Sequence, residues 1–314
     1  MSPAHGFRGR HVVSAEDFSK DELLHLLDTA AFFEHDVGPR LAGKILATLF
    51  FEPSTRTRLS FESAMHRLGG SVIGFADEKA TSRTKGESLA DTIRMVEGYC
   101  DAIVIRHPME GAARLAAETA RVPVINGGDG SNQHPTQTFL DLYTIRKATG
   151  RLDGLRVGFF GDLRYSRTVH SLAKALLHFD VAMSFIGPPM LRLPQELRET
   201  LGARGRLGRE VEGLDDARPL DVLYVTRIQK ERFPDPADYE RMKNAYRLDR
   251  AAAERFGPDL KILHPLPRVT EVATDVDDLP GALYFEQARN GVTVRKALLS
   301  LVLADADASG GGLA

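Results

Sequence analysis

The chain has little of what marks several large classes of protein. Its 314 residues include a single cysteine, Cys100, and its formal net charge at pH 7 is only −2. One cysteine excludes an internal disulfide and a cysteine-rich metal site, and it fits a reducing compartment. A charge so close to zero gives no general reason to bind nucleic acid or an anionic membrane. Any bound anion must therefore be held by local groups.

Long apolar runs are also missing. No segment approaches the roughly 18 apolar residues that a membrane-spanning helix needs. The opening stretch, MSPAHGFRGRHVVSAEDF, lacks the apolar centre of a signal peptide. We therefore expect a cytoplasmic protein.

Several cofactor and metal motifs are absent as well. No GxxxxGK[ST] phosphate loop occurs, and the stretch around Gly158 and Gly161 lacks the third glycine of a dinucleotide fingerprint. The histidines show no HExxH or similar spacing, so we expect no metal. Binding of NAD or ATP is only weakly indicated.

What the chain does contain is a regular series of short apolar runs, which predict buried strands. Stretches with helical apolar spacing separate most of them, and this alternation favours parallel sheets covered on both faces. The predicted fold class is α/β, with two doubly wound parallel-sheet domains of four strands each. The predicted strands are 44–51, 71–76, 102–107, 122–127, 156–161, 181–187, 222–227 and 261–267.

The length suits two domains of about 100 to 150 residues each. Between the fourth and fifth predicted strands, Gly150 and Gly154 bracket a polar turn. We expect the first domain to cover 1–149 and the second 150–286, followed by a C-terminal helix at about 287–304.

Polar clusters follow most of the predicted strands. Ligands of open parallel sheets bind outside the carboxyl ends of the strands, where loops lead into helices. If two domains face each other by these edges, they form one cleft rich in arginine, lysine, histidine and hydroxyl groups. We expect the active site in that cleft.

The densest cluster is FEPSTRTRLSF, residues 51–61. The apolar spacing that starts at Phe61 predicts that Ser54 to Arg58 form the first turns of a helix. Free backbone N–H groups and the helix dipole make such a start an anion site, and phosphate is its natural occupant. Arg58 should face the fold with Glu62 as partner, which leaves Arg56 for a ligand. The alternative is an ordinary capped helix with exposed charges.

Three further residues stand out by position. His134 follows a glycine-rich turn and precedes another predicted helix; it is either structural or a donor to a carbonyl oxygen that gains negative charge. Arg167 and Arg227 each lie just beyond a strand. Two arginine forks in one cleft suit a dicarboxylate, although either alone could be a surface salt bridge.

Seven ordered motifs resemble the aspartate and ornithine transcarbamoylase family over nearly the whole chain. Pro265 stands where the ornithine branch usually carries cysteine, and the paired arginines fit aspartate, so the resemblance is to the aspartate branch. The motifs are FEPSTRTRLSFE (51–62), KGESLADT (85–92), HPTQTFLDL (134–142), GDLRYSRTVHSL (161–172), TRIQKERF (226–233), HPLPR (264–268) and YFEQARNGVTVRKALL (284–299).

This resemblance implies transfer of a carbamoyl group from carbamoyl phosphate to L-aspartate in pyrimidine synthesis, with no cofactor. It implies a carbamoyl-phosphate-binding first domain, with the C-terminal helix packed back on it, and an aspartate-binding second domain. Ser54, Thr55, Arg56 and Thr57 would hold the phosphate, while Thr57, Arg106 and His134 would polarise the carbamoyl oxygen. The carbamoyl NH2 would be held by Gln137 and the carbonyls of Leu266 and Pro267. Aspartate would be bound by Arg167, Arg227 and Gln229, and Lys85 would contact both substrates.

The resemblance also implies a homotrimer, in which the loop Thr81–Lys85 enters a neighbouring subunit's site. Thr81 stands where the family usually has serine, and no role is assigned to Arg83. Regulatory or dihydroorotase partners are possible in such a family, and segment 229–242 is expected to act as a lid. Two alternatives stay open: a transcarbamoylase for another amine, and a non-catalytic scaffold.

Overall fold

The computed structural model describes residues 6–35, 38–77, 86–228, 239 and 246–304. The chain divides into two compact units, Met1–Leu140 with Arg289–Ala314, and Asp141–Ala288. Both divisions fall inside helices, namely α5 (Pro135–Thr149) and α10 (Tyr284–Leu303). Within the described ranges, no helix combines the length and apolarity needed to cross a bilayer.

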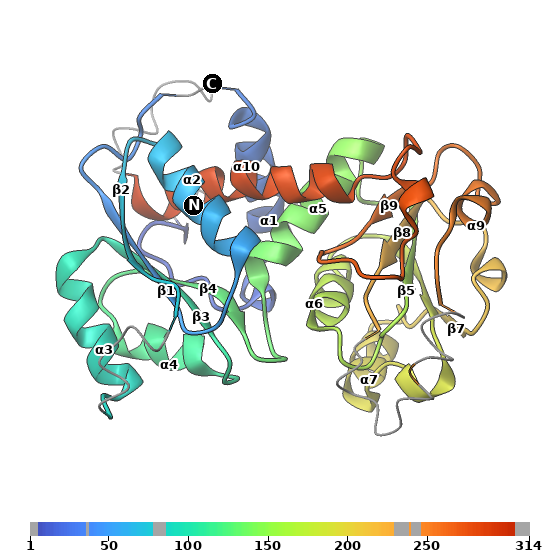
Figure 1. The fold of residues 1–314 in the computed structure, drawn as a ribbon, viewed down its shortest axis with the longest axis horizontal. Coiled ribbons are helices and arrows are strands. Elements are labelled where there is room, and N and C mark those ends of the chain that lie inside the picture. Colours follow the sequence, from blue (N-terminus) through green and yellow to red (C-terminus); the bar gives the residue numbers. More distant parts are fainter. Residues whose placement is uncertain (1–5, 36–37, 78–85, 229–238, 240–245, 305–314) are drawn as a thin grey trace. The chain divides into compact units, whose positions relative to one another are not determined.

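The first unit is built on a four-stranded parallel sheet in the order β2-β1-β3-β4. Figure 1 shows α3 and α4 on one face of this sheet and α1 and α2 on the other. Side chains alternate along a strand, so Ala47 and Leu49 of β1 pack with Ile93 of α3 and Ala113 of α4. The elements are α1 (Lys20–Phe32), β1 (Ile45–Phe50), α2 (Thr55–Arg67), β2 (Ser71–Phe75), α3 (Leu89–Val96), β3 (Ala102–His107), α4 (Ala112–Thr119) and β4 (Val124–Asp129).

The second unit contains a five-stranded parallel sheet in the order β7-β6-β5-β8-β9. The strands β5, β6 and β8 are almost entirely buried, as expected for a sheet covered on both faces. The elements are β5 (Leu155–Phe160), α6 (Arg167–Leu176), β6 (Val181–Ile186), α7 (Gln195–Ala203), β7 (Arg209–Val211), β8 (Val222–Val225), α9 (Arg250–Glu254) and β9 (Lys261–Leu263).

The two-unit parallel α/β fold predicted from sequence is confirmed, as are all eight predicted strands. The division into four strands and four is wrong, because β7 was missed. This strand has only three residues, two of them charged, and lies at the edge of the sheet, where short charged strands are common. The strand predicted at 261–267 ends at Leu263, before the two prolines of the HPLPR motif.

The predicted helix start at Ser54 to Arg58 is also confirmed, and α1 has a second well-defined start. The α1 helix begins with a capping box, in which Ser19 and Glu22 each accept a hydrogen bond from the other's backbone N–H. The apolar stripe of α2, made of Phe61, Ala64 and Met65, is completely buried. The α2 helix is thus anchored by its inner face, and its first turn lies at the carboxyl end of β1.

Candidate active site

The start of α2 differs from the starts of α1 and α3 in the same unit. Ser19 and Ser88 cap their helices through their own side chains, but the Ser54 hydroxyl makes no such capping bond. The first turn of α2 contains no acidic residue, and Thr55 and Arg56 are exposed there. Unsatisfied N–H groups, the positive end of the helix dipole and nearby hydroxyls together form a site for an anion.

The two arginines of this turn are in different surroundings, as predicted. The Arg58 Nε lies 3.4 Å from Glu62 Oε1, one helical turn away, so its charge is balanced within α2. Among the described residues, no carboxylate lies within ion-pair distance of Arg56. Burial and the positive charge of Arg106 both lower the pKa of Arg56. Two neighbouring cations make this part of the unit favourable for an anion.

Arg106 lies at the end of β3, with its side chain 16% exposed. Its Nη2 is 2.7 Å from Glu52 Oε1, and its Nη1 donates to the carbonyl of Gly127 at 3.2 Å. Burial lowers the pKa of Arg106, and Glu52 acts in the opposite direction. Sequence reasoning gave Glu52 no role, although it lies inside the FEPSTRTR motif. An anion that binds Arg106 has to compete with the Glu52 carboxylate.

His134 is buried and joins the start of α5 to the start of α2. Its Nε2 lies 3.3 Å from the Thr57 hydroxyl oxygen, and its backbone carbonyl accepts the Gln137 N–H at 3.0 Å. The preceding chain turns through Gly128 (φ 119°) and Gly130 (φ 54°), a conformation that side chains disfavour. Thr57 and His134, which come from two different motifs and are 77 residues apart, therefore lie in contact.

Sequence reasoning missed a buried arginine that holds these two helix starts together. Arg295 of α10 donates from Nη2 to the Thr136 hydroxyl at 3.1 Å, next to His134. Its guanidinium carbon also lies 4.9 Å from the centre of the Phe61 ring on α2. The available signal was that Arg295 lies among the apolar residues of the predicted C-terminal helix, in the stretch VRKALLSLVL. Arg295 of α10 therefore contacts both α2 and α5.

The second unit also has an uncapped helix start at the carboxyl edge of its sheet. Ser166 precedes α6 without a side-chain capping bond, and Arg167 is the first helical residue. Gly161, at φ 115°, lets the end of β5 approach the neighbouring strand, because a Cβ there would lie 2.4 Å from the Thr226 carbonyl oxygen. Arg227 lies two residues beyond the end of β8. Arg167, at the start of the helix after β5, and Arg227 thus both lie beyond the carboxyl ends of two adjacent strands.

The loop after β9 has an unusual backbone that buried hydrogen bonds hold in place. Leu266 has φ 54°, and its N–H donates to His264 Nδ1 at 2.8 Å. His264 Nε2 lies 2.7 Å from Glu271 Oε1. Burial raises the pKa of Glu271, but hydrogen bonds from His264 and the backbone outweigh it, so the net pKa is lowered. Leu266 is half-buried and Pro267 is exposed.

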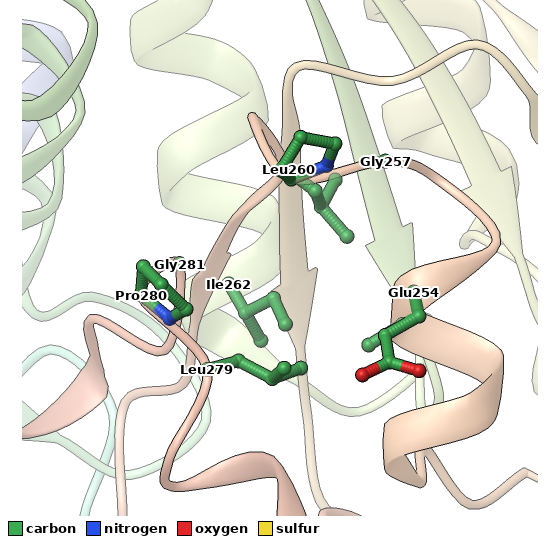
Figure 2. A pocket seen from close by; sticks show the side chains of 9 residues that line it. Glu254, Gly257, Leu260, Ile262, Leu279, Pro280 and Gly281 are labelled. Atoms are coloured by element: carbon green, nitrogen blue, oxygen red, sulfur yellow. The ribbon is translucent and has the colours of Figure 1, made fainter.

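A separate hollow of about 260 Å³ lies between α9, the start of β9 and the segment 279–281 (Figure 2). Leu260, Ile262 and Leu279 give it an apolar lining, and its one charged lining residue is Glu254. It lies at the amino end of β9, whereas the arginines lie at the carboxyl ends of β5 and β8. With no cation in its lining, this hollow does not suit an anion.

Some predicted features lie outside the described residues: Lys85 with the loop Thr81–Lys85, Gln229, and almost all of the segment 229–242. Within the described part of the chain, no cluster of three or more histidine, cysteine or acidic residues could hold a metal ion.

Fold and site together define a class: a two-unit parallel α/β protein with uncapped helix starts and arginine side chains beyond the carboxyl ends of its strands. Two family descriptions match it, the carbamoyl-phosphate-binding domain of aspartate/ornithine carbamoyltransferase at residues 10–147 and the aspartate/ornithine-binding domain at 153–302. The chain belongs to the aspartate/ornithine carbamoyltransferase family, which confirms the resemblance noted from its motifs.

Similar proteins within the family are named for aspartate. The aspartate carbamoyltransferase catalytic subunits of Thermococcus onnurineus and Methanopyrus kandleri are 58% and 59% identical, over 95% of this chain and 98% of each relative. The catalytic subunit of M. jannaschii aspartate transcarbamoylase matches with TM-score 0.88 and 55% identity, over 93% of this chain and 97% of that one. The Trypanosoma cruzi enzyme with N-(phosphonacetyl)-L-aspartic acid matches with TM-score 0.90 and 39% identity, over 95% and 97% of the two chains.

Proposed function

We propose that this chain transfers the carbamoyl group of carbamoyl phosphate to the amine of L-aspartate. The products are N-carbamoyl-L-aspartate and phosphate, an early step of pyrimidine biosynthesis. The observation that carries the proposal is the grouping of the uncapped α2 start, Arg106 and the Thr57–His134 contact. Its support from relatives is the high identity to aspartate carbamoyltransferase catalytic subunits along nearly the whole chain.

In this proposal the first unit holds carbamoyl phosphate. The α2 start, Ser54 to Thr57, binds the phosphate through backbone N–H groups, hydroxyls and the Arg56 guanidinium. Thr57, Arg106 and His134 donate to the carbamoyl oxygen. The Gln137 side chain of the first unit accepts from the carbamoyl NH2. The backbone carbonyls of Leu266 and Pro267, which belong to the second unit, also accept from it.

The second substrate needs two cationic groups, because aspartate has two carboxylates. Arg167 begins α6, the helix after β5, and Arg227 lies two residues beyond β8, the strand next to β5; each guanidinium can hold one carboxylate through two parallel hydrogen bonds. Gln229 and Lys85 complete the proposed set, Gln229 on aspartate and Lys85 on both substrates.

The chemistry requires donors more than it requires a base. The aspartate nitrogen attacks the carbamoyl carbon, and the bond from that carbon to the phosphate oxygen then breaks. Negative charge grows first on the carbonyl oxygen and then on phosphate, so donors fixed in advance stabilise the transition state more than the ground state. The departing phosphate can take the proton from the amine. Arg106 and His134 therefore act as electrostatic stabilisers.

We also propose the division of labour along the chain: residues 1–149 with the helix at about 287–304 for carbamoyl phosphate, and 150–286 for aspartate. The proposed assembly is a homotrimer with Thr81–Lys85 reaching a neighbouring site. An exposed edge supports this, because β2 is largely exposed and carries Ile73 at 40% exposure. A regulatory or dihydroorotase partner is proposed only because relatives are named catalytic subunits. A cytoplasmic location is proposed from the single cysteine.

The deciding experiment supplies purified protein with carbamoyl phosphate and a panel of amino acids and amines. We expect a carbamoyl product with L-aspartate and none at comparable rate with ornithine. Formation of product only with another amine would replace the proposed substrate. If no amine in the panel gives a carbamoyl product, a non-catalytic scaffold is favoured. Native mass measurement on the same sample tests the trimer.

A matched pair of variants tests the phosphate site. Arg56→Ala should abolish measurable turnover, because it removes a cation from the anion site. Arg58→Ala removes a charge two residues away that is already paired with Glu62, so it should retain most activity. Equal loss in the two variants, with the assembly intact by native mass, would contradict the proposed role of α2.

A further inference from the structure

A series of buried hydrogen bonds runs through the second unit and ends on the loop after β9. Asp141 of α5 is completely buried, and it accepts from the Tyr224 hydroxyl at 2.8 Å and from Gln287 Nε2 at 2.7 Å. Gln287 Oε1 in turn accepts the backbone N–H of His264 at 2.9 Å. Through Gln287, a carboxylate on α5 thus determines where the loop leaves its strand.

Each hydrogen bond in this series can run in only one direction, from a fixed donor to a fixed acceptor. The Asp141 carboxylate can only accept, so Tyr224 and the Gln287 nitrogen must donate to it. Burial and the Asp141 charge raise the pKa of Tyr224 well above its ordinary value, which keeps its hydroxyl a donor. The Gln287 amide cannot turn over, because its oxygen would then face the carboxylate. The series therefore keeps the Gln287 oxygen facing the His264 backbone N–H.

The His264 side chain extends the hydrogen-bond series into the loop. Its Nδ1 accepts the Leu266 N–H at 2.8 Å, so its Nε2 carries the hydrogen that is donated to Glu271. Leu266 has φ 54°, a conformation that costs a residue with a side chain free energy and persists only when the surroundings hold it. The hydrogen bonds of the buried His264 hold Leu266 in this conformation.

We infer that Asp141 and Gln287 are positioning residues that aim the backbone carbonyls of Leu266 and Pro267 at the NH2 group of carbamoyl phosphate. A buried carboxylate is expensive, and apolar side chains would fill the same space more cheaply. The orientation that the carboxylate imposes on the Gln287 amide, with its oxygen toward the His264 N–H, explains its presence. The inference rests on the proposed function, because it assigns a purpose to the loop in that reaction.

The test uses Gln287→Met, which keeps the length of the side chain and removes its hydrogen bonds. Two ligands are compared: carbamoyl phosphate, and acetyl phosphate as a competitor with a methyl group in place of the NH2. Misplaced carbonyls should weaken carbamoyl phosphate about tenfold and lower kcat about a hundredfold. Acetyl phosphate, which offers no NH2 to these carbonyls, should change by less than about twofold. Equal weakening of both ligands would overturn the inference.

The control is Val222→Ala, a buried change two residues from Tyr224 on β8. It destabilises the same unit without touching the hydrogen-bond series, so any effect of lower stability alone will appear in it. At a matched loss of Tm, it should leave the ratio of the two ligand affinities unchanged. The same shift of that ratio in both variants would mean that the series is only structural.

A charge exchange tests the series even if Gln287→Met does not fold. Gln287→Glu alone sets two carboxylates against each other and should lower kcat strongly. Adding Asp141→Asn reverses the central hydrogen bond, because the new amide at position 141 donates to the new carboxylate at position 287. The Tyr224 hydroxyl and the His264 N–H keep their acceptors. The double variant should recover kcat to within about tenfold of the wild type. Failure to recover, with a normal fold, counts against the inference; a wild type that forms no carbamoyl product counts against the proposed function instead.

Discussion

Both units have an uncapped helix start at the carboxyl ends of their strands, but the second unit adds a loop of backbone acceptors that the first unit lacks among its described residues. In the first unit the polar groups are donors, and a single helix start, Ser54–Thr57, supplies many of them. In the second unit the loop at Leu266 offers backbone acceptors in a strained conformation, held by bonds such as Asp141–Gln287, between residues 146 apart in the chain. A donor site for phosphate can be local, whereas precise acceptors for an NH2 group need support from the whole unit.

The largest expected effect removes a donor from the first unit. His134→Ala should lower kcat by about a hundred- to a thousandfold, because a fixed donor to the developing negative charge is lost. The measurement is steady-state formation of carbamoyl aspartate. His66→Ala, an exposed change in the last turn of α2, is the control and should stay within about twofold. A small effect of His134→Ala on kcat would mean that the first unit binds carbamoyl phosphate without stabilising the transition state through His134.

The next effect should be confined to the second substrate. Arg167→Ala should raise the KM for aspartate about ten- to a hundredfold, because charge-assisted hydrogen bonds are worth roughly 1.5–3 kcal/mol each. The KM for carbamoyl phosphate should change little. Arg164→Ala, an exposed arginine of the same loop, is the control. If the KM for carbamoyl phosphate rises instead, the assignment of substrates to units is wrong.

A smaller effect concerns stability and its pH dependence. The folded-state pKa of Glu271 is lowered, so its stabilising contribution is present above the unfolded pKa near 4.5 and is lost as pH falls through the folded value. Glu271→Gln should cost about 1–3 kcal/mol of unfolding free energy at pH 7, and the difference from wild type should shrink toward pH 4. Chemical denaturation at both pH values measures this. A difference that grows in acid would contradict the pairing with His264.

The smallest effect uses the one cysteine as a probe of the first unit. Burial raises the pKa of the Cys100 thiol to about 11, so roughly one thiol in a thousand is ionised at pH 8. Its reaction with a disulfide reagent should be slow in the native protein and should accelerate as pH rises. In denaturant it should react at the rate of free cysteine. Fast native reaction at pH 8 would show that the first unit opens readily around α3.

The sequence predicted the alternating fold well, and the exceptions have physical causes. Apolar runs such as the one in β1 are long enough to be recognised, because a strand buried on both faces has to be apolar throughout. The edge strand β7 carries Arg209 and Glu210, so its sequence does not differ from that of a loop. Its pairing with β6 is visible only in three dimensions.

The candidate site could be predicted where its chemistry is local. The start of α2 was recognised because the residues that create an anion site, from Ser54 to Arg58, are consecutive, and helical geometry separates Arg56 from Arg58. The pairing of Arg106 with Glu52 could not be predicted, because any of several carboxylates could have reached that arginine.

The sequence by itself determined the buried strands, the helix start at Ser54 to Arg58 and, through its motifs, the family. Tertiary structure alone decided which distant groups meet: Thr57 with His134, Arg295 with Thr136, and Asp141 with Tyr224 and Gln287. Helix starts and strands follow from neighbours along the chain, where side-chain spacing and backbone geometry are known. Buried polar contacts depend on which elements pack together, and each group takes the partner that the finished fold leaves within hydrogen-bond distance.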